Sequence, residues 1–170
     1  MTAFTTTAGK VFTRDTLRHQ VEIWRAQGQT IVLTNGCFDL LHAGHIETLE
    51  AARAHGNVLI VGVNSDASVK GLKGQDRPLN PEMNRARVIA ALACVDAVTI
   101  FNESTASELL AALRPHVYVK GGDYRVETLP ERDVVAACDI RVVFCPLVAG
   151  LSTTQLIEAV RTPDETLSPR

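Results

Sequence analysis

The sequence predicts an α/β fold built on one open, mostly parallel five-stranded sheet with helices on both faces. Short runs of apolar and β-branched residues recur along the chain, which is typical of strands buried on both faces. Segments with apolar residues at helical spacing alternate with these runs, as in right-handed β-α-β units. The 170 residues, 46% hydrophobic and 21% charged, suit one compact domain and disfavour disorder or a coiled coil.

The first half of the chain predicts three helices and two strands. Thr13 is a candidate N-cap for a helix that carries Leu17, Val21 and Trp24, and Gly28 ends it. A strand at residues 30–34 follows, and then a helix with apolar residues at Ile46, Leu49 and Ala52. The second strand lies at residues 57–63. A helix at residues 81–93 follows, with Asn80 as its cap and Pro81 at its first position.

The second half predicts three more strands, at residues 95–101, 117–119 and 140–145. Thr105 and Glu108 form a capping box ahead of a helix rich in leucine. Ser152 and Gln155 form another capping box, which opens a final helix to about Arg161. We therefore expect a single Rossmann-like doubly wound domain at residues 30–161. An N-terminal segment with one helix at residues 1–29 and a flexible tail at 162–170 complete the chain.

Composition excludes several kinds of partner. A net charge of -2 argues against binding to nucleic acid or to an anionic membrane through bulk charge. No apolar run approaches the ~20 residues that span a bilayer, and the first ten residues lack the features of a signal peptide. The four cysteines, Cys37, Cys94, Cys138 and Cys145, have no metal-binding spacing, so a cytoplasmic enzyme with free thiols is expected.

The segment after the first strand carries the strongest chemical signal. In a doubly wound sheet, ligands bind beyond the C-terminal ends of the strands. There the chain reads Asn35-Gly36-Cys37-Phe38-Asp39, followed by His42-Ala43-Gly44-His45 at the start of a helix. The glycine lets backbone amides approach a ligand, and the helix N-terminus favours an anion. Histidines three residues apart share a face, from which both can donate to phosphate oxygens.

Two other interpretations of the histidines stay open. They could be polar surface residues of a capped helix, or metal ligands, although the i, i+4 spacing with an intervening glutamate is missing. The P-loop and the G-x-G-x-x-G motif are also missing, which disfavours P-loop and dinucleotide-binding proteins.

The motif His42-Ala43-Gly44-His45 resembles the HxGH signature of the nucleotidyltransferase superfamily. Further matches follow in order along nearly the whole chain, at residues 34–39, 63–68, 72–74, 77–78, 119–124 and 152–154. Together they resemble the D-glycero-β-D-manno-heptose 1-phosphate adenylyltransferase family, whose members occur alone or fused behind a sugar kinase. The pattern departs from that family at residues 127–139, which leaves the acceptor sugar and the subunit contact open.

Basic residues after the second strand are expected in a loop beside the phosphates. Lys73 is the best candidate for the triphosphate, and Arg77 can hold a phosphate bidentately. For Lys70 a solvated surface position is the alternative, and for Arg85, on the helix begun by Pro81, a surface role is equally supported. The resemblance adds Asn64 and Asp66 to the substrate contacts.

Two later segments complete the expected nucleotide site. Lys120-Gly121-Gly122-Asp123 follows the fourth strand, and the resemblance implies that it forms a nucleoside wall; a plain glycine loop is the alternative. Ser152-Thr153-Thr154 can cap its helix and also bind phosphate, and the family places this motif beside the outer phosphates.

The resemblance implies an enzyme that makes ADP-heptose and pyrophosphate from ATP and heptose 1-phosphate, by in-line attack on the α-phosphate. His42, His45 and Lys73 are the expected catalytic residues, and Asn35, Gly36, Cys37 and Phe38 offer backbone amides. Asp39 is expected to orient a histidine or a water on the metal. Mg²⁺ is expected to be held mainly by the triphosphate, without a protein metal site. A homodimer and a separate sugar kinase are also implied.

Two alternatives remain. One is a cytidylyltransferase or another adenylyltransferase that acts on a different small phosphate, such as glycerol 3-phosphate or FMN. The other is a nucleotide-binding regulatory domain without catalysis. The intact histidine pair and Lys73 disfavour the second, because binding alone needs no donors at the α-phosphate.

Overall fold

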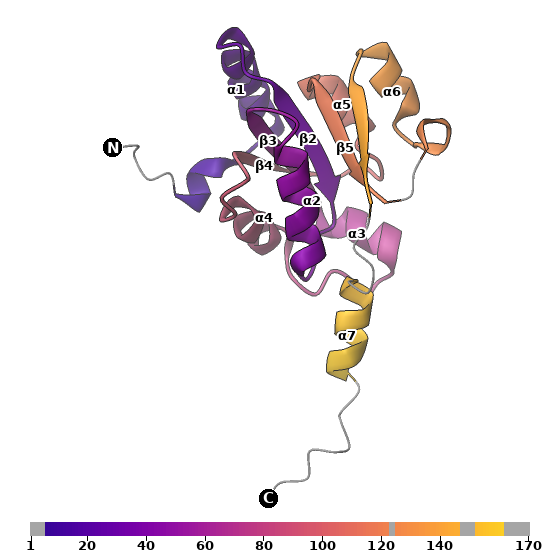
Figure 1. Cartoon of the computed structure of the whole chain (residues 1–170). Helices are drawn as coiled ribbons and strands as arrows, with labels where there is room; N and C mark the ends of the chain where they lie inside the picture. Colours follow the sequence, from indigo (N-terminus) through magenta and orange to yellow (C-terminus); the bar gives the residue numbers. More distant parts are fainter. Residues whose placement is uncertain (1–5, 123–124, 147–151, 162–170) are drawn as a thin grey trace, which may run out of the picture.

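An open parallel sheet forms the centre of the molecule (Figure 1). The computed structural model describes residues 6–122, 125–146 and 152–161. Within these ranges the sheet has six strands in the order β1-β4-β3-β2-β5-β6, and every neighbouring pair is parallel. The strands are β1 (Val11–Phe12), β2 (Ile31–Gly36), β3 (Val58–Asn64), β4 (Ala97–Phe101), β5 (Val117–Gly121) and β6 (Arg141–Cys145).

Helices cover both faces of the sheet. The helices are α1 (Arg14–Ala26), α2 (Ala43–Arg53), α3 (Asp66–Lys73), α4 (Glu82–Ala90), α5 (Ser107–Leu113), α6 (Arg132–Ala137) and α7 (Thr153–Arg161), with short 3-10 turns at Thr7–Lys10 and Val126–Thr128. Core residues of α1, α5 and α6 pack on one face, and those of α2 and α4 pack on the other. Helix α7 extends away from this body at one end (Figure 1).

The central strands supply both cores because side chains alternate along a strand. In β2, Ile31 and Leu33 belong to the core beneath α1 and α5, whereas Val32 belongs to the core beneath α2 and α4. Every residue of β3 is buried. The predicted α/β class, with buried parallel strands, is therefore confirmed.

Several local predictions are confirmed. The Oγ1 atom of Thr13 accepts a hydrogen bond from the backbone N–H of Thr16 at 3.3 Å, so Thr13 caps α1. Gly28 has a φ of 72°, the left-handed conformation that glycine adopts after a helix. At the last helix, Ser152 Oγ accepts from the N–H of Gln155 at 3.1 Å.

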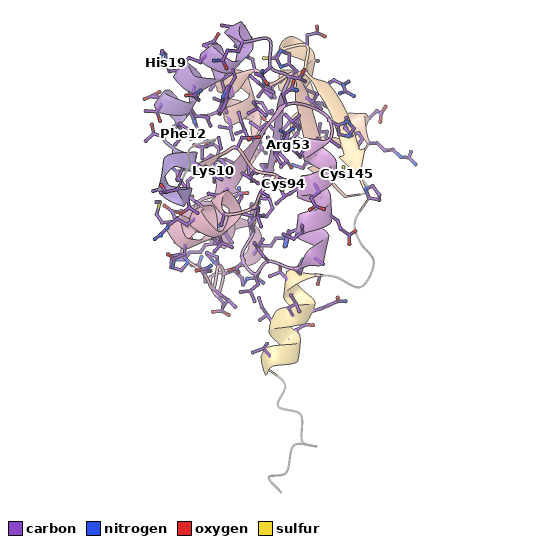
Figure 2. All side chains as sticks on the ribbon, turned by 60° about the vertical axis from the view of Figure 1, so that its left-hand side comes forward. Lys10, Phe12, His19, Arg53, Cys94 and Cys145 are labelled. Carbon is purple, nitrogen blue, oxygen red and sulfur yellow. The ribbon has the colours of Figure 1, made fainter. Side chains whose placement is uncertain are left out.

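The expected strand count is one too low, because the short strand β1 was missed. Val11 and Phe12 pair with β4, and two residues are too few for a recognisable strand pattern. Just before this strand, Lys10 Nζ donates to the carbonyl of Val95 at 2.7 Å, next to Cys94 (Figure 2). The segment at residues 1–29 thus contributes an edge strand, and α1 adds Leu17 and Val21 to the core.

Two helix starts differ from the sequence prediction. The Thr105 hydroxyl bonds to Ser107 Oγ, and α5 begins after Ala106, whose N–H donates instead to the carboxylate of Glu131. Helix α4 begins after Pro81, with no side-chain cap from Asn80.

Two helices were not expected. The basic residues Lys70 and Lys73 lie on α3 and not in a loop, because Ser65 caps this helix by accepting from the N–H of Ser68. Helix α6 lies in the region at residues 127–139 that departs from the family pattern. The tail expected at residues 162–170 lies outside the described residues.

The strand order reverses between β2 and β5. From β2 the chain builds outward through β3 and β4, and then returns to place β5 and β6 on the other side of β2. Side chains and backbone at the C-terminal ends of β2 and β5 therefore border the crevice where doubly wound sheets bind ligands.

Candidate active site

A pocket of about 410 Å³ opens at this reversal of strand order. Its lining comes from the ends of β2 and β5, the first turns of α2 and α7, and the end of α3 with the loop that follows. The lining residues are Thr34, Asn35, Gly36, Cys37, Phe38, His42, Gly44, His45, Thr48, Lys73, Arg77, Lys120, Gly121, Ser152, Thr153 and Thr154. Segments far apart in the sequence thus meet in one cavity.

The two histidines lie together on the pocket wall. His42 is the N-cap of α2 and His45 lies in its first turn, so both side chains stand at the positive end of the helix dipole. Their rings stack with centroids 3.9 Å apart and planes inclined by 27°. The predicted convergence of both imidazoles on one spot beside the glycine turn is confirmed, and the rings are not separate surface groups.

Hydrogen bonding determines which ring nitrogens face a ligand. The backbone N–H of His42 donates to His45 Nδ1 at 3.3 Å, so the proton of a neutral His45 ring lies on Nε2. His42 Nδ1 is buried and has no hydrogen-bond partner among the described residues, which leaves Nε2 as the accessible nitrogen. Nε2 is therefore the nitrogen that each ring has left for a ligand.

His45 is a neutral donor in the free protein. Burial, and to a smaller extent the neighbouring His42, lowers its pKa from 6.5 to about 4. At neutral pH this ring is therefore uncharged, and it can donate one hydrogen bond from Nε2.

Phe38 supports His45 from the glycine turn. Its ring centroid lies 5.4 Å from that of His45, and its backbone has a φ of 47°. A Cβ atom on Gly36 would approach the Phe38 ring to 3.1 Å, closer than ordinary contact. Glycine at position 36 therefore lets the Phe38 ring lie over the turn and against the histidine.

Three cations border the pocket. Lys73 ends α3, Arg77 lies in the loop before α4, and Lys120 lies in β5. Lys73 is exposed and has no carboxylate partner within the described part of the chain. Three positive groups around a pocket whose described lining residues include no carboxylate suit a polyanionic ligand such as a phosphate chain.

Asp39 holds the loop that carries Arg77. Its carboxylate accepts from Arg77 Nε at 2.6 Å and from the backbone N–H groups of Leu79 and Asn80 at 2.8 and 3.0 Å. Burial favours the protonated acid, but these hydrogen bonds outweigh it and lower the pKa of Asp39. Asp39 thus lies outside the pocket lining with both oxygens bonded to this loop, and its expected role beside a histidine or a metal-bound water stays a prediction.

A hydrogen-bonded chain runs from the glycine turn to Lys120. The Tyr118 hydroxyl donates to Asn35 Oδ1 at 2.6 Å and accepts from Lys120 Nζ at 3.1 Å. Lys120 Nζ also donates to both carboxylate oxygens of Glu131, at 3.2 and 3.4 Å. Asn35 and Lys120 thus have fixed positions relative to each other.

The start of α7 closes the other side of the pocket. Ser152, Thr153 and Thr154 line it, as predicted, and Thr153 Oγ1 donates to the carbonyl of Leu40 at 3.1 Å. This bond ties α7 to the turn that leads into α2, so two helix N-termini border one cavity.

Other predicted contacts lie outside the pocket lining. Arg85 is buried and donates to Asp66 Oδ1 at 2.7 Å and to the carbonyls of Asn80 and Cys37. Asn64 is buried and donates to Ser68 Oγ. In the structure Arg85 and Asn64 are thus internal supports, and the partly exposed Asp66 pairs with Arg85. None of the three borders the pocket, and their contacts with substrate stay a prediction.

Lys70, Gly122 and Asp123 are also not among the residues that line the pocket in the described part of the chain. Lys70 is exposed and does not border the pocket. Gly122 is buried behind the lining, where its N–H donates to the carbonyl of Cys145. Asp123 lies outside the described residues.

The sequence alone assigned no role in the site to four residues that line or support the pocket. Thr48 lies one turn after His45 on α2, and helical periodicity could have found it. Thr34 precedes the glycine turn, and it was included in the matching motif at residues 34–39 without a role in the site. Tyr118 and Glu131 act through Lys120, and no spacing in the sequence connects Glu131 with the pocket.

The described residues contain no group of three histidine, cysteine or carboxylate side chains that could hold a metal ion. Among them, too, no helix has both the length and the apolar character that crossing a bilayer requires.

Comparison with known proteins identifies close relatives. The model of the family described as cytidylyltransferase-like matches residues 33–163. Three proteins named bifunctional protein HldE are similar to this chain. The one from Syntrophotalea carbinolica is 49% identical over 151 residues, which are 89% of this chain and 31% of the relative. Those from Koribacter versatilis and Hyphomonas neptunium are 53% and 54% identical over 88% and 84% of this chain, and 31% and 29% of each relative.

The chain thus spans about a third of the length of these curated relatives. Among solved structures, the lipopolysaccharide core biosynthesis protein from Thermoplasma volcanium GSS1 shares the fold. It has a TM-score of 0.59 at 24% identity, over 71% of this chain and 98% of that protein.

Proposed function

Because the chain belongs to the cytidylyltransferase-like family, we propose that its pocket transfers an adenylyl group from ATP to heptose 1-phosphate. The products are ADP-heptose and pyrophosphate. The similarity to proteins named bifunctional protein HldE, together with the motifs at residues 34–39, 119–124 and 152–154, supports this choice of substrates.

One observation carries the proposal: the stacked His42 and His45 rings share a pocket with the glycine turn and three cations. A surface helix cap would need neither ring in a cavity. A phosphate chain, by contrast, needs hydrogen-bond donors near the reacting phosphorus and positive charge along its length.

The proposed reaction needs no general base. A phosphate oxygen of the sugar 1-phosphate attacks the α-phosphorus of ATP and forms the new P–O bond. The bond from the α-phosphorus to the β-bridging oxygen breaks, and pyrophosphate leaves with the electron pair. The nucleophile is already an anion, so catalysis rests on positioning and on stabilising charge that grows on the α-phosphate and the leaving oxygen.

The catalytic residues in this proposal are His42, His45 and Lys73. The Nε2 atoms of the two histidines donate to oxygens around the α-phosphorus, where backbone amides at the start of α2 add further donors. Lys73, which ends α3, neutralises charge on the departing pyrophosphate.

The nucleotide is held by two walls of the pocket. Asn35 to Phe38 and Gly121 bind the nucleoside side, Lys120 binds the phosphate chain beside it, and Ser152 to Thr154 donate to the outer phosphates. Arg77 is the remaining cation and is assigned to the sugar phosphate, which it can bind bidentately.

We propose that magnesium enters as part of the MgATP substrate. Those lining residues that the structure describes offer cations, amides and hydroxyls and no carboxylate, so they fit the phosphate chain better than a bare cation. Magnesium bound to the triphosphate would neutralise part of the negative charge of the phosphates.

The proposal extends to partners and location. A sugar kinase must supply the heptose 1-phosphate, because the acceptor needs a phosphate on its anomeric carbon. We further propose that the protein works in the cytoplasm as a homodimer, which light scattering during size-exclusion chromatography would measure.

A panel of nucleotides and acceptors tests the function. Pyrophosphate release is measured with ATP, CTP and GTP, each against heptose 1-phosphate, glycerol 3-phosphate and FMN. ATP with heptose 1-phosphate should give the highest kcat/KM. The family description favours cytidylyl transfer as the second candidate, which highest activity with CTP would support. Nucleotide binding without release for every acceptor would instead indicate a regulatory domain.

A further inference from the structure

Glu131 is a buried carboxylate behind the wall of the pocket. It precedes α6, its side chain is 1% exposed, and it does not border the pocket itself. Its partner in an ion pair is Lys120, whose side chain is 15% exposed and does border the pocket. A buried carboxylate is costly unless it is paired, so Glu131 holds the ammonium group firmly.

Lys120 Nζ is held from two directions. Glu131 accepts from it on one side at 3.2 Å, and Tyr118 Oη accepts on the other at 3.1 Å. Tyr118 in turn donates to Asn35, at the end of β2. The position of the ammonium group on β5 is therefore fixed relative to the glycine turn at the end of the neighbouring strand β2.

The same arrangement occurs at the cation Arg77. Its side chain is also 15% exposed, and its carboxylate partner Asp39 is 1% exposed and likewise outside the lining. Two of the three cations around the pocket are thus fixed from behind by buried carboxylates. In both pairs, a buried carboxylate behind the pocket wall holds a cation that borders the pocket.

We propose that Glu131 is a positioning residue that fixes Lys120 where it binds the anionic part of the nucleotide. The inference rests on the proposed function only for the identity of the ligand. Because Lys120 contacts the bound nucleotide before and during the reaction alike, loss of its placement weakens nucleotide binding more than it slows the chemical step.

Glu131 also has a structural contact, and the test must distinguish its effect from that of the ion pair with Lys120. One carboxylate oxygen accepts from the backbone N–H of Ala106 at 3.1 Å, just before α5. Glu131→Gln keeps an amide oxygen for this N–H and removes the negative charge that pairs with Lys120.

A double-mutant cycle with Glu131→Gln and Lys120→Met tests the inference. The dissociation constant for MgATP is measured by calorimetry without acceptor, and MgCTP is the second probe. Each single variant should weaken binding about 10-fold, the scale of one charge-assisted hydrogen bond. The double variant should bind no more weakly than Lys120→Met alone, because Glu131 acts through Lys120.

Turnover and a control variant complete the test. Both single variants should raise the nucleotide KM with kcat changed by less than about threefold. Lys120→Arg, which keeps a cation that reaches Glu131, should restore most of the binding. Glu103→Gln removes the carboxylate partner of Arg14, away from the pocket lining, and should leave nucleotide binding unchanged.

Two results would overturn the inference without touching the proposed function. One is a folded Glu131→Gln protein that binds nucleotide as the wild type does. The other is an equal weakening by Glu131→Gln with and without Lys120, which would assign Glu131 to the support of α5. A wild-type protein that binds neither MgATP nor MgCTP overturns both proposals. Nucleotide binding without transfer to heptose 1-phosphate removes only the proposed function, and the cycle still decides the role of Glu131.

Discussion

At the scale of single residues, the chemistry of the site depends on how each side chain is held. His45 uses its Nδ1 to accept from its own helix N-terminus, which directs Nε2 to the ligand. Stacking on His42 and contact with Phe38 fix the ring plane. Sequence spacing was enough to predict the histidine pair, because residues three apart on a helix are neighbours in any fold.

His45→Ala is expected to lower kcat at least ~100-fold with a modest change in the KM for ATP, the scale of losing one transition-state donor. Steady-state pyrophosphate release measures both constants. His19→Ala is the matched control, since His19 is exposed on α1 at the end of the molecule far from α7 (Figure 2). Near-normal kcat in a folded His45→Ala protein would remove His45 from the mechanism.

The titration of His45 gives a second residue-scale prediction. Because burial and His42 lower its pKa from 6.5 to about 4, the unfolded chain binds a proton in this pH window that the folded protein does not. The contribution of His45 to the free energy of unfolding should therefore fall as the pH drops from 6.5 to 4 and stay constant below that range.

Two measurements check this titration. NMR of the histidine ring should show a midpoint near 4 for His45 in the free protein. In urea unfolding, His45→Gln should show a weaker loss of stability between pH 6.5 and 4 than the wild type. A His45 midpoint near 6.5 would contradict the buried, neutral donor.

At the scale of elements, the site depends on how loops are tied to the sheet. The turn after β2 and the loop before α4 are joined through Asp39, whose oxygens meet Arg77, Leu79 and Asn80. The sequence predicted only some of these elements correctly. Helix α3 was assigned to a loop although Ser65 and Asp66 carry a recognisable helix start, because the lysines and glycines that follow favour a loop.

Asp39→Asn tests this tie. The change leaves Arg77 without its buried carboxylate and should lower the free energy of unfolding by about 3 kcal/mol at neutral pH. The pKa of Asp39 is lowered from 3.8, so its stabilisation is fully present above about pH 4 and is lost as the pH falls through the lower folded value. The difference between the two proteins should therefore shrink only in strong acid.

Urea unfolding at neutral and acid pH measures this difference. Asp133→Asn is the control, because Asp133 is 92% exposed and its surface ion pair contributes little. Equal stability of Asp39→Asn and the wild type at neutral pH would contradict the structural role of Asp39.

At the scale of the whole molecule, the N-terminal segment is part of the domain core. Helix α1 buries Leu17 and Val21 completely, and β1 completes the sheet edge beside β4. The sequence suggested a separate segment before residue 30, because a two-residue strand carries almost no pattern.

Deletion of residues 1–29 should abolish cooperative folding. Burial of Leu17 and Val21 alone contributes about 3–6 kcal/mol, a large share of the roughly 5–15 kcal/mol that stabilises a domain. Thermal unfolding followed by circular dichroism measures the effect, and Leu17→Ala in the full chain should give a partial loss of about 2–5 kcal/mol. A stable protein that begins at residue 30 would show that α1 is dispensable.

The sequence by itself determined the features that depend on near neighbours: the alternation of strands and helices, the glycine turn, and two histidines on one helical turn. Backbone geometry and hydrophobic periodicity act over a few residues, so these features hold in any compact fold. Only the tertiary structure decided that Asp39 and Glu131 hold Arg77 and Lys120, two cations that the motifs had already assigned to the site. Asp39 and Arg77 lie 38 residues apart, and such contacts follow from strand order and burial, which local pattern does not encode.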